Sequence, residues 1–321
     1  MIGLVLGACL VAVAAGCGGS ERLSGPIVVR GSTTVLPIVS QVADGFARRH
    51  PYVDFDVDMV GSEDGIADLC SGLVPLAGSS RPLTEDERQS CRASGVDVAT
   101  FEIAHDAVVL LSRTDPAVRC LTLAQIEAAA GSEARGRDSW EEVARASGTP
   151  VADLPSGPFT LVGPGPGSGT LAVFEAEALG PPAAARGVDA RIRDDYTAVE
   201  AEQAIRNALA TRPGSLGVVG YTTAVHWLGQ LRPVAVDAGK GCVSPTPAAI
   251  RSGRYPLSRD LYLLVDVGAV RERPQVAAFV GDFLGPTGRD APAQVGSVAL
   301  SGSQADRVAR KWRTRLSGGG S

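Results

Sequence analysis

"FTLVGPGPGSGTLAV", Phe159–Val173, runs from an apolar segment through a glycine-rich turn into a helical pattern. "GSTTV" (Gly31–Val35), "GSEDG" (Gly61–Gly65) and "GSSRP" (Gly78–Pro82) share this design, with small residues between an extended segment and a helix start. Strands that alternate with helices in this way are typical of α/β folds with largely parallel sheets. We therefore predict such a fold, and a length of 321 residues fits two lobes of this kind.

The four turns together indicate a site for an anion. A helix N-terminus leaves backbone N–H groups unpaired and carries about half a positive charge. Glycine lets the backbone approach a ligand closely, and the hydroxyls of Ser and Thr add further donors. Each turn alone is better explained by ordinary helix capping, so it is their recurrence that favours a shared ligand. The net charge of −5 gives a nucleic-acid partner no electrostatic support.

Known catalytic motifs do not fit the glycine-rich turn. A nucleotide-binding P-loop needs a lysine after its last glycine, and Ser168, Gly169 and Thr170 occupy that place here. A serine-hydrolase elbow needs glycine two residues before its serine, where this chain has Pro166. The dipeptide His105-Asp106 could act as a pair of catalytic bases or as metal ligands. A strand position near a lobe junction is the simpler interpretation. We expect no catalytic residues and no cofactor.

Capping signals predict where several helices begin. The pattern of Thr followed three residues later by Glu or Gln occurs at Thr84 with Glu87, Thr122 with Gln125, and Thr197 with Glu200. Behind the glycine-rich turn, Gly180 and the two prolines that follow it predict the end of a helix.

The N-terminus indicates export. The apolar run of residues 1–16 is too short to span a bilayer comfortably. The sequence "AAGC" that ends at Cys17 resembles a bacterial lipobox, in which the cysteine becomes the lipidated N-terminus. We predict a signal peptide over residues 1–16 and a lipidated linker over residues 17–25. A short membrane anchor that stays attached is the alternative.

Export changes the interpretation of the remaining cysteines, Cys70, Cys91, Cys120 and Cys242. Four cysteines in an oxidising compartment predict two disulfides, for which three connectivities exist. The cysteines form no CxxC pair and the three histidines are scattered, so we expect no metal site.

The chain resembles the phosphate-binding lipoproteins of high-affinity phosphate ABC transporters, the PstS-type periplasmic binding proteins. The resemblance extends from about Ile27 to Leu316 and depends on the order and spacing of several motifs together. These motifs are "GSTTVLPIV", "GSSRPLTEDE" followed by a cysteine, "GPGPGSGT" before a helix with Phe174, "DYTAVE", "GSLGVVGY", "GKGCVSP" and "YPLSRDLYLLV".

The resemblance implies a two-lobed type II binding-protein fold with the ligand between the lobes. Lobe I would consist of residues 26–106 and 258–316, lobe II of residues 107–257, and residues 317–321 would form a disordered tail. The chain would cross between the lobes near residues 104–108 and 257–261. The disulfides would join Cys70 to Cys91 and Cys120 to Cys242, each within one lobe.

The resemblance also implies a set of phosphate contacts, carried over motif by motif. The contacts would come from Thr33, Thr34 and Val35 in the first turn, Ser62 in the second, Ser80 and Arg81 in the third, and Ser168, Gly169 and Thr170 in the fourth.

Departures from the family pattern affect the choice of ligand. Some relatives carry an arginine where this chain has Pro164, and others carry Asp where it has Gly167 or Ser80. Arg81 is therefore our candidate for the main cationic contact, because a guanidinium grips phosphate bidentately; pairing with Asp86 or with solvent is the alternative. The carboxylates of Glu63 and Asp64 could accept the proton of phosphate, face solvent, or oppose an anion.

The function that we predict is capture of inorganic phosphate by a monomeric, lipid-anchored extracytoplasmic protein. It would deliver the ligand to an ABC permease and catalyse no reaction. A binder or sensor of sulfate or another oxyanion is the alternative, followed by an exported phosphatase or hydrolase.

Overall fold

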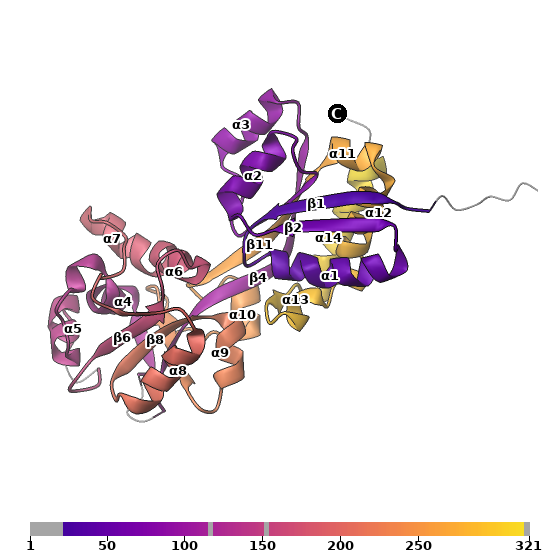
Figure 1. Ribbon diagram of the computed structural model, residues 1–321. Coiled ribbons are helices and arrows are strands. Elements are labelled where there is room, and N and C mark those ends of the chain that lie inside the picture. Colours follow the sequence, from indigo (N-terminus) through magenta and orange to yellow (C-terminus); the bar gives the residue numbers. More distant parts are fainter. Residues whose placement is uncertain (1–21, 115–117, 151–153, 318–321) are drawn as a thin grey trace, which may run out of the picture.

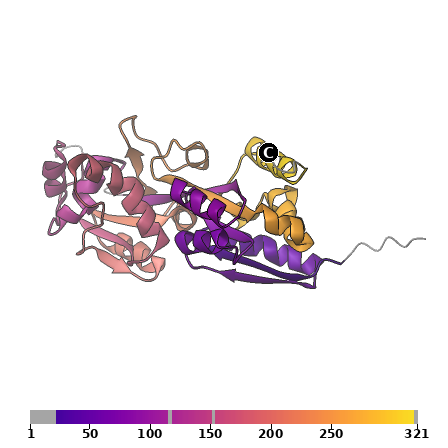
Figure 2. The same cartoon turned by 90° about the horizontal axis from the view of Figure 1, so that it is seen from above.

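The computed structural model describes residues 22–114, 118–150 and 154–317. The predicted signal peptide and Cys17 lie outside these residues. The chain forms two α/β lobes that lie side by side and are joined by two long strands (Figures 1 and 2). Within the described ranges, every helix falls short of the length or the apolar character that crossing a membrane requires.

Lobe I is built on three parallel strands with helices on both faces. β1 (Gly25–Gly31) lies between β2 (Val53–Asp58) and β3 (Leu76–Ser79). Successive side chains of a strand point to opposite faces, so Ile27 and Val29 pack toward one helical layer and Val28 toward the other. The remaining elements of this lobe are α1 (Leu36–Arg49), α2 (Ser62–Cys70), α3 (Glu85–Ala93), α11 (Val267–Glu272), α12 (Pro274–Leu284), η4 (Pro286–Gly288), α13 (Ala291–Gln294), β12 (Val298–Ala299) and α14 (Gly302–Ser317).

Two antiparallel strands connect the lobes. β4 (Val98–Ser112) pairs with β11 (Ser258–Asp266) over residues 98–107 and then with β8 (Ser215–Gly220) over residues 108–112. β11 in turn pairs with β3, so that one sheet path runs β2-β1-β3-β11-β4-β8-β6-β7 through the molecule. β4 is therefore one strand shared by both lobes.

Lobe II repeats the parallel arrangement. β6 (Thr160–Pro164) lies between β8 and β7 (Thr197–Val199), parallel to both. Its other elements are β5 (Cys120–Thr122), α4 (Leu123–Ala130), η1 (Ser132–Ala134), α5 (Trp140–Ser147), α6 (Gly169–Val173), η3 (Phe174–Leu179), α7 (Gly180–Arg186), α8 (Glu202–Thr211), α9 (Tyr221–Trp227), β9 (Arg232–Pro233), β10 (Ala235–Asp237) and α10 (Pro247–Arg251).

The apolar cores follow the two lobes. One cluster takes its buried side chains from residues 107–257 and from Val298. The two other clusters take theirs from residues 27–104 and from residues 261–312, on opposite faces of the lobe I sheet. The limits that we predicted for the lobes stay predictions, although these clusters divide at the same two places. Ser317 still belongs to α14, and residues 318–321 of the predicted tail lie outside the described residues.

Two of the three predicted capping boxes are confirmed. Thr84 and Glu87 exchange hydrogen bonds at the start of α3, and Thr122 and Gln125 do so at the start of α4. The third was wrong, because Thr197 begins β7 and α8 begins only at Glu202 without a side-chain cap.

The predicted helix end at Gly180 was also wrong. The helix that follows the glycine-rich turn continues through a π-helical stretch, Phe174–Leu179, into α7. Pro181 and Pro182 lie directly after the π-helical stretch, in the first turn of α7. The helix ends instead before Gly187, whose φ of 69° suits glycine.

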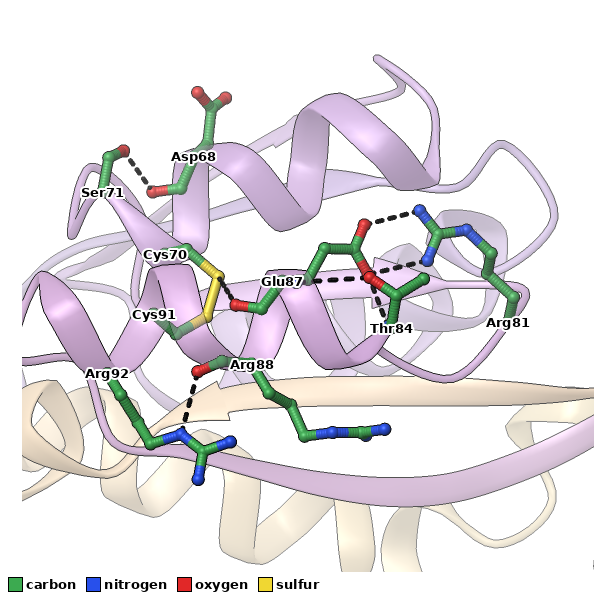
Figure 3. Close-up of a disulfide and its surroundings, with 9 residues drawn as sticks. All are labelled: Asp68, Cys70, Ser71, Arg81, Thr84, Glu87, Arg88, Cys91 and Arg92. Atoms are coloured by element: carbon green, nitrogen blue, oxygen red, sulfur yellow. Dashed lines mark hydrogen bonds and ion pairs between the residues drawn. A yellow bond between two sulfur atoms is a disulfide. The ribbon is translucent and has the colours of Figure 1, made fainter.

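Both disulfides join the cysteines that the resemblance implied. Cys70–Cys91 ties α2 to α3 (Figure 3), and Cys120–Cys242 ties β5 to the segment after β10. Neither bond has a cysteine on β4 or β11, so the two connecting strands carry no disulfide.

Candidate functional site

Two of the predicted turns face each other across a cleft between the lobes. Thr33 and Thr34 follow β1 of lobe I, and the residues 168–170 follow β6 of lobe II. A methyl group added to Gly169 would lie 3.3 Å from Thr33 Oγ1, which shows how closely the turns approach. The cleft has a volume of about 270 Å³ and is lined by Thr33, Thr34, Pro37, Asp106, Ser168, Gly169, Thr170, Gly220, Thr222, Val295 and Ser297.

Glycine is required at the start of the first turn. Gly31 has a φ of 135°, and a Cβ added there would lie 2.1 Å from the carbonyl oxygen of Gly78. The turn then closes on itself, since the N–H of Thr34 donates to Ser32 Oγ and the N–H of Val35 donates to the Ser32 carbonyl at 3.0 Å. Val35 is fully buried and does not line the cleft. Its predicted ligand contact stays a prediction, whereas Thr33 and Thr34 line the cleft.

The fourth turn is organised by its own backbone. Gly167 has a φ of 85°, a conformation that an Asp there would adopt only with strain. Ser168 caps α6, because its Oγ accepts from the Thr170 N–H at 3.2 Å. Pro164 belongs to β6, and its carbonyl accepts from the Tyr196 hydroxyl at 2.7 Å. The two departures from the family pattern therefore fit the local backbone, and they leave this turn with donors and no carboxylate.

The second and third turns meet each other beside the cleft. Ser62 Oγ lies 3.2 Å from Ser80 Oγ and accepts from the Ser80 N–H at 3.1 Å. Glu63 and Asp64, both exposed, occupy the first turn of α2, where negative charge is favourable. Neither serine is among the residues that line the cleft, so their predicted contacts with the ligand stay predictions.

Arg81 pairs with a carboxylate of its own lobe. Its Nη1 and Nη2 donate to the two carboxylate oxygens of Glu87 at 2.8 and 2.6 Å (Figure 3). This ion pair lowers the pKa of Glu87 to about 2, with Arg81 as the largest cause. The alternative predicted from the sequence was that Arg81 pairs with Asp86 or with solvent. In the structure Arg81 pairs with Glu87, the next residue after Asp86. A phosphate contact for Arg81 stays a prediction.

A charged pair on the connecting strands lies at the cleft instead. Asp106 of β4 lines the cleft, and Arg259 stands opposite it on β11. The guanidinium donates to Asp106 Oδ2 from Nη2 at 3.1 Å and from Nε at 3.3 Å. Nη2 also donates to Thr34 Oγ1 at 2.8 Å. The two side chains are only 12% and 9% exposed. A largely buried cation thus ties the first turn to a carboxylate on the strand that joins the lobes.

Glu177 of lobe II adds a further carboxylate near this pair. Burial raises the pKa of Glu177, and the charge of Arg259 acts in the opposite direction. Glu177 lies in the π-helical stretch behind the glycine-rich turn, so an element of lobe II approaches the cation of β11.

The Asp106–Arg259 pair was missed by reasoning from the sequence. The available signal was the occurrence of two charged dipeptides, His105-Asp106 and Arg259-Asp260, within otherwise apolar strands near the predicted crossings. A charge in a buried strand requires a partner, and each dipeptide supplies one for the other.

A family model described as "PBP superfamily domain" matches residues 18–284. The chain therefore belongs to the PBP superfamily. Protein SphX of Synechococcus elongatus is 26% identical over 295 residues, which cover 91% of this chain and 82% of SphX. The phosphate-binding protein PstS of Staphylococcus aureus is 26% identical over 294 residues, which cover 90% and 82% of the two chains.

Solved structures show the same relationship. The crystal structure of a possible phosphate binding protein from Planctomyces limnophilus matches with a TM-score of 0.77 and 29% identity, covering 92% of this chain and 99% of that one. A phosphate transport receptor from Vibrio cholerae shares the fold, with a TM-score of 0.66 and 20% identity. The resemblance to PstS-type binding proteins and the two-lobed α/β fold are thereby confirmed.

Proposed function

We propose that this protein captures inorganic phosphate in the cleft between its lobes and delivers it to an ABC permease. The observation that carries the proposal is the pair of facing turns, one from each lobe, whose hydroxyl-bearing residues line one small polar cleft. An anion bound there would contact both lobes and so favour their closure, which is the work of a binding protein rather than of an enzyme. The phosphate-binding relatives support the same ligand.

Asp106 supports phosphate over sulfate. Phosphate near neutral pH keeps at least one proton and sulfate keeps none, so a carboxylate in the cleft accepts a hydrogen bond from phosphate and repels sulfate. An ionised carboxylate offers about four lone-pair sites, and Arg259 occupies only some of them through Oδ2. The guanidinium also offsets the negative charge that Asp106 would otherwise present to an anion. We infer that Asp106 accepts the hydrogen bond from the proton of phosphate, a role for which the sequence had suggested Glu63 or Asp64.

Calorimetric titration of ligand-free protein with phosphate and then sulfate tests the proposal. We expect heat with phosphate at low micromolar concentration and little with sulfate. D106N should weaken phosphate binding and narrow the preference over sulfate by at least about tenfold, because a site built to accept a proton discriminates steeply. D54N, an exposed change on β2, is the matched control. No heat with phosphate would refute the proposed function.

The anchor, the enzyme alternative and the permease need separate tests. We propose that Cys17 carries lipid on the outer side of the membrane, and incorporation of labelled palmitate that C17S abolishes would support this. A chromogenic phosphate ester should give a flat trace with the purified protein; steady release would contradict a pure binding role. Delivery to a permease predicts that cells lacking this protein take up phosphate more slowly and recover when it is restored.

A further inference from the structure

A second charged cluster lies on the connecting strands, directly beside the Asp106–Arg259 pair. His105 of β4 and Asp260 of β11 stand opposite each other, one register position from that pair. Because successive residues of a strand point to opposite faces, this cluster faces away from the phosphate cleft. None of its members lines the cleft, and the proposed phosphate binding does not use them.

His105 contacts one carboxylate at each of its two ring nitrogens. His105 Nδ1 lies 2.8 Å from Asp260 Oδ1, and His105 Nε2 lies 3.4 Å from Glu102 Oε1. One such atom from each of the three residues lies within 4.8 Å of both others. The imidazole is buried with 4% of its side chain exposed, whereas the side chains of Glu102 and Asp260 are 35% and 46% exposed. The histidine is thus fixed in place, and the carboxylates are open to an ion from solvent.

The neighbours of the cluster come from α14 and β11. The amide of Gln304 on α14 lies 3.4 Å from His105 Nε2. The hydroxyl of Tyr262 on β11 donates to Asp260 Oδ2 at 3.3 Å. The positive charge of Arg307 on α14 also acts on Glu102.

We propose that Glu102, His105 and Asp260 form a binding site for a divalent transition-metal ion, with Zn²⁺ as its representative. One imidazole and two carboxylates are a donor set that Zn²⁺ accepts, at bond lengths of about 2.0–2.2 Å. Such bonds place neighbouring donors about 3.2–3.5 Å apart. Because Asp260 and Glu102 contact different nitrogens of His105, one carboxylate must move toward the ring nitrogen that binds the ion. Their partial exposure allows this shift. The imidazole binds in its neutral form, and any proton on the ligating nitrogen leaves for solvent; water completes the coordination.

The position of the site gives an ion a structural effect. Glu102 and His105 belong to β4 and Asp260 to β11, so the ion would bridge the two strands that join the lobes. It would do so on the face opposite the cleft, without touching the proposed phosphate contacts. Metal binding and phosphate binding are therefore separable by experiment.

Calorimetric titration of the chelator-treated full chain with ZnCl₂ tests this site, and MgCl₂ serves as the comparison because Mg²⁺ prefers an all-oxygen shell. We expect one Zn²⁺ per chain and no response to Mg²⁺. H105Q should weaken Zn²⁺ binding more than about tenfold, as loss of a ligand costs at least as much as loss of its outer-shell partner. H226Q, an exposed histidine of α9, should bind like the wild type.

Two further variants keep the test decisive if H105Q fails to fold, which near-UV circular dichroism reports. E102Q and D260N change partly exposed side chains, and each should weaken Zn²⁺ binding while phosphate titration stays as in the wild type. Absence of Zn²⁺ binding overturns the proposal. So does Zn²⁺ binding that is equal in the wild type and in E102Q and D260N, since the ion would then lie elsewhere.

Discussion

Replacing Arg259 with Ala should weaken both phosphate binding and the fold. The guanidinium makes three hydrogen bonds, two to Asp106 and one to Thr34. In R259A the Asp106 carboxylate stays largely buried without its cation. Breaking a buried pair by removing one partner costs about 3–5 kcal/mol, so we expect the free energy of unfolding in urea to fall by about 3 kcal/mol.

The loss in phosphate affinity follows from the same contacts. The variant leaves the charge of Asp106 facing the anion and frees the hydroxyl of Thr34 at the cleft. A charge-assisted hydrogen bond contributes about 1.5–3 kcal/mol, and each 1.4 kcal/mol is a factor of ten in Kd. We therefore expect calorimetry to show a Kd for phosphate that is higher by about tenfold to hundredfold.

Two control variants decide whether this reasoning holds. D106A/R259A removes both charges, so it should recover most of the stability while phosphate still binds weakly for lack of an acceptor. R81A breaks the partly exposed pair with Glu87. It therefore tests the cation predicted from the sequence against Arg259, the cation found at the cleft. If R259A binds phosphate within about twofold of the wild type and R81A does not, Arg259 has no part in binding.

Three further outcomes are expected. The pKa of Glu87 is about 2 beside Arg81, and NMR should show it rising toward its ordinary value in R81A. Because the folded-state pKa is lowered, the pair stabilises the fold above about pH 4.5. This stabilisation is lost as the pH falls through about 2. Removing Cys120–Cys242, with a separation of 122 residues, should cost about 1.5 kcal/mol more in urea than removing Cys70–Cys91, with a separation of 21, because the cost grows with the logarithm of loop length; equal costs would contradict the loop-length argument. G167A should lower the free energy of unfolding by about 1 kcal/mol because its φ of 85° is strained for alanine, and an unchanged urea midpoint would mean that the turn relaxes.

Local signals predicted most of the fold because strand, turn and helix are decided within a few residues. The apolar runs before Gly31 and Gly163 became β1 and β6, and the capping boxes at Thr84 and Thr122 became helix starts. The failures at Thr197 and Gly180 have different physical causes. Tertiary pairing of β7 with β6 overrode a capping pattern, and a π-helical stretch carried a helix across residues that ordinarily end one.

The candidate site was predicted only in part, for a different reason. Thr33, Thr34 and residues 168–170 carry their signal in the turn itself, so they could be named from the sequence and now line the cleft. Asp106 and Arg259 are 153 residues apart. Their meaning appears only when β4 and β11 pair, because each residue alone is a charge in an apolar strand. Arg81 was preferred because it lies beside a recognisable turn. Glu87, six residues further on, could equally pair with its charge and does so in the structure.

The division of labour between the turns and the connecting strands explains why the glycine-rich turn needs neither lysine nor carboxylate. A helix N-terminus with hydroxyls donates to any oxyanion, so the turns supply attraction without choosing among anions. Choice requires an acceptor, and in this protein the carboxylate that lines the cleft sits on β4, where the lobes join. A ligand that satisfies Asp106 therefore binds at the segment that must bend when the cleft closes. Under the proposed function, the strand that accepts the hydrogen bond from phosphate is also one of the strands that join the lobes. We therefore expect D106N to reduce the lobe closure caused by phosphate more than the closure caused by sulfate. Small-angle scattering measures this closure. If D106N reduced closure by the two ligands equally, the hydrogen bond to Asp106 would have no part in lobe closure.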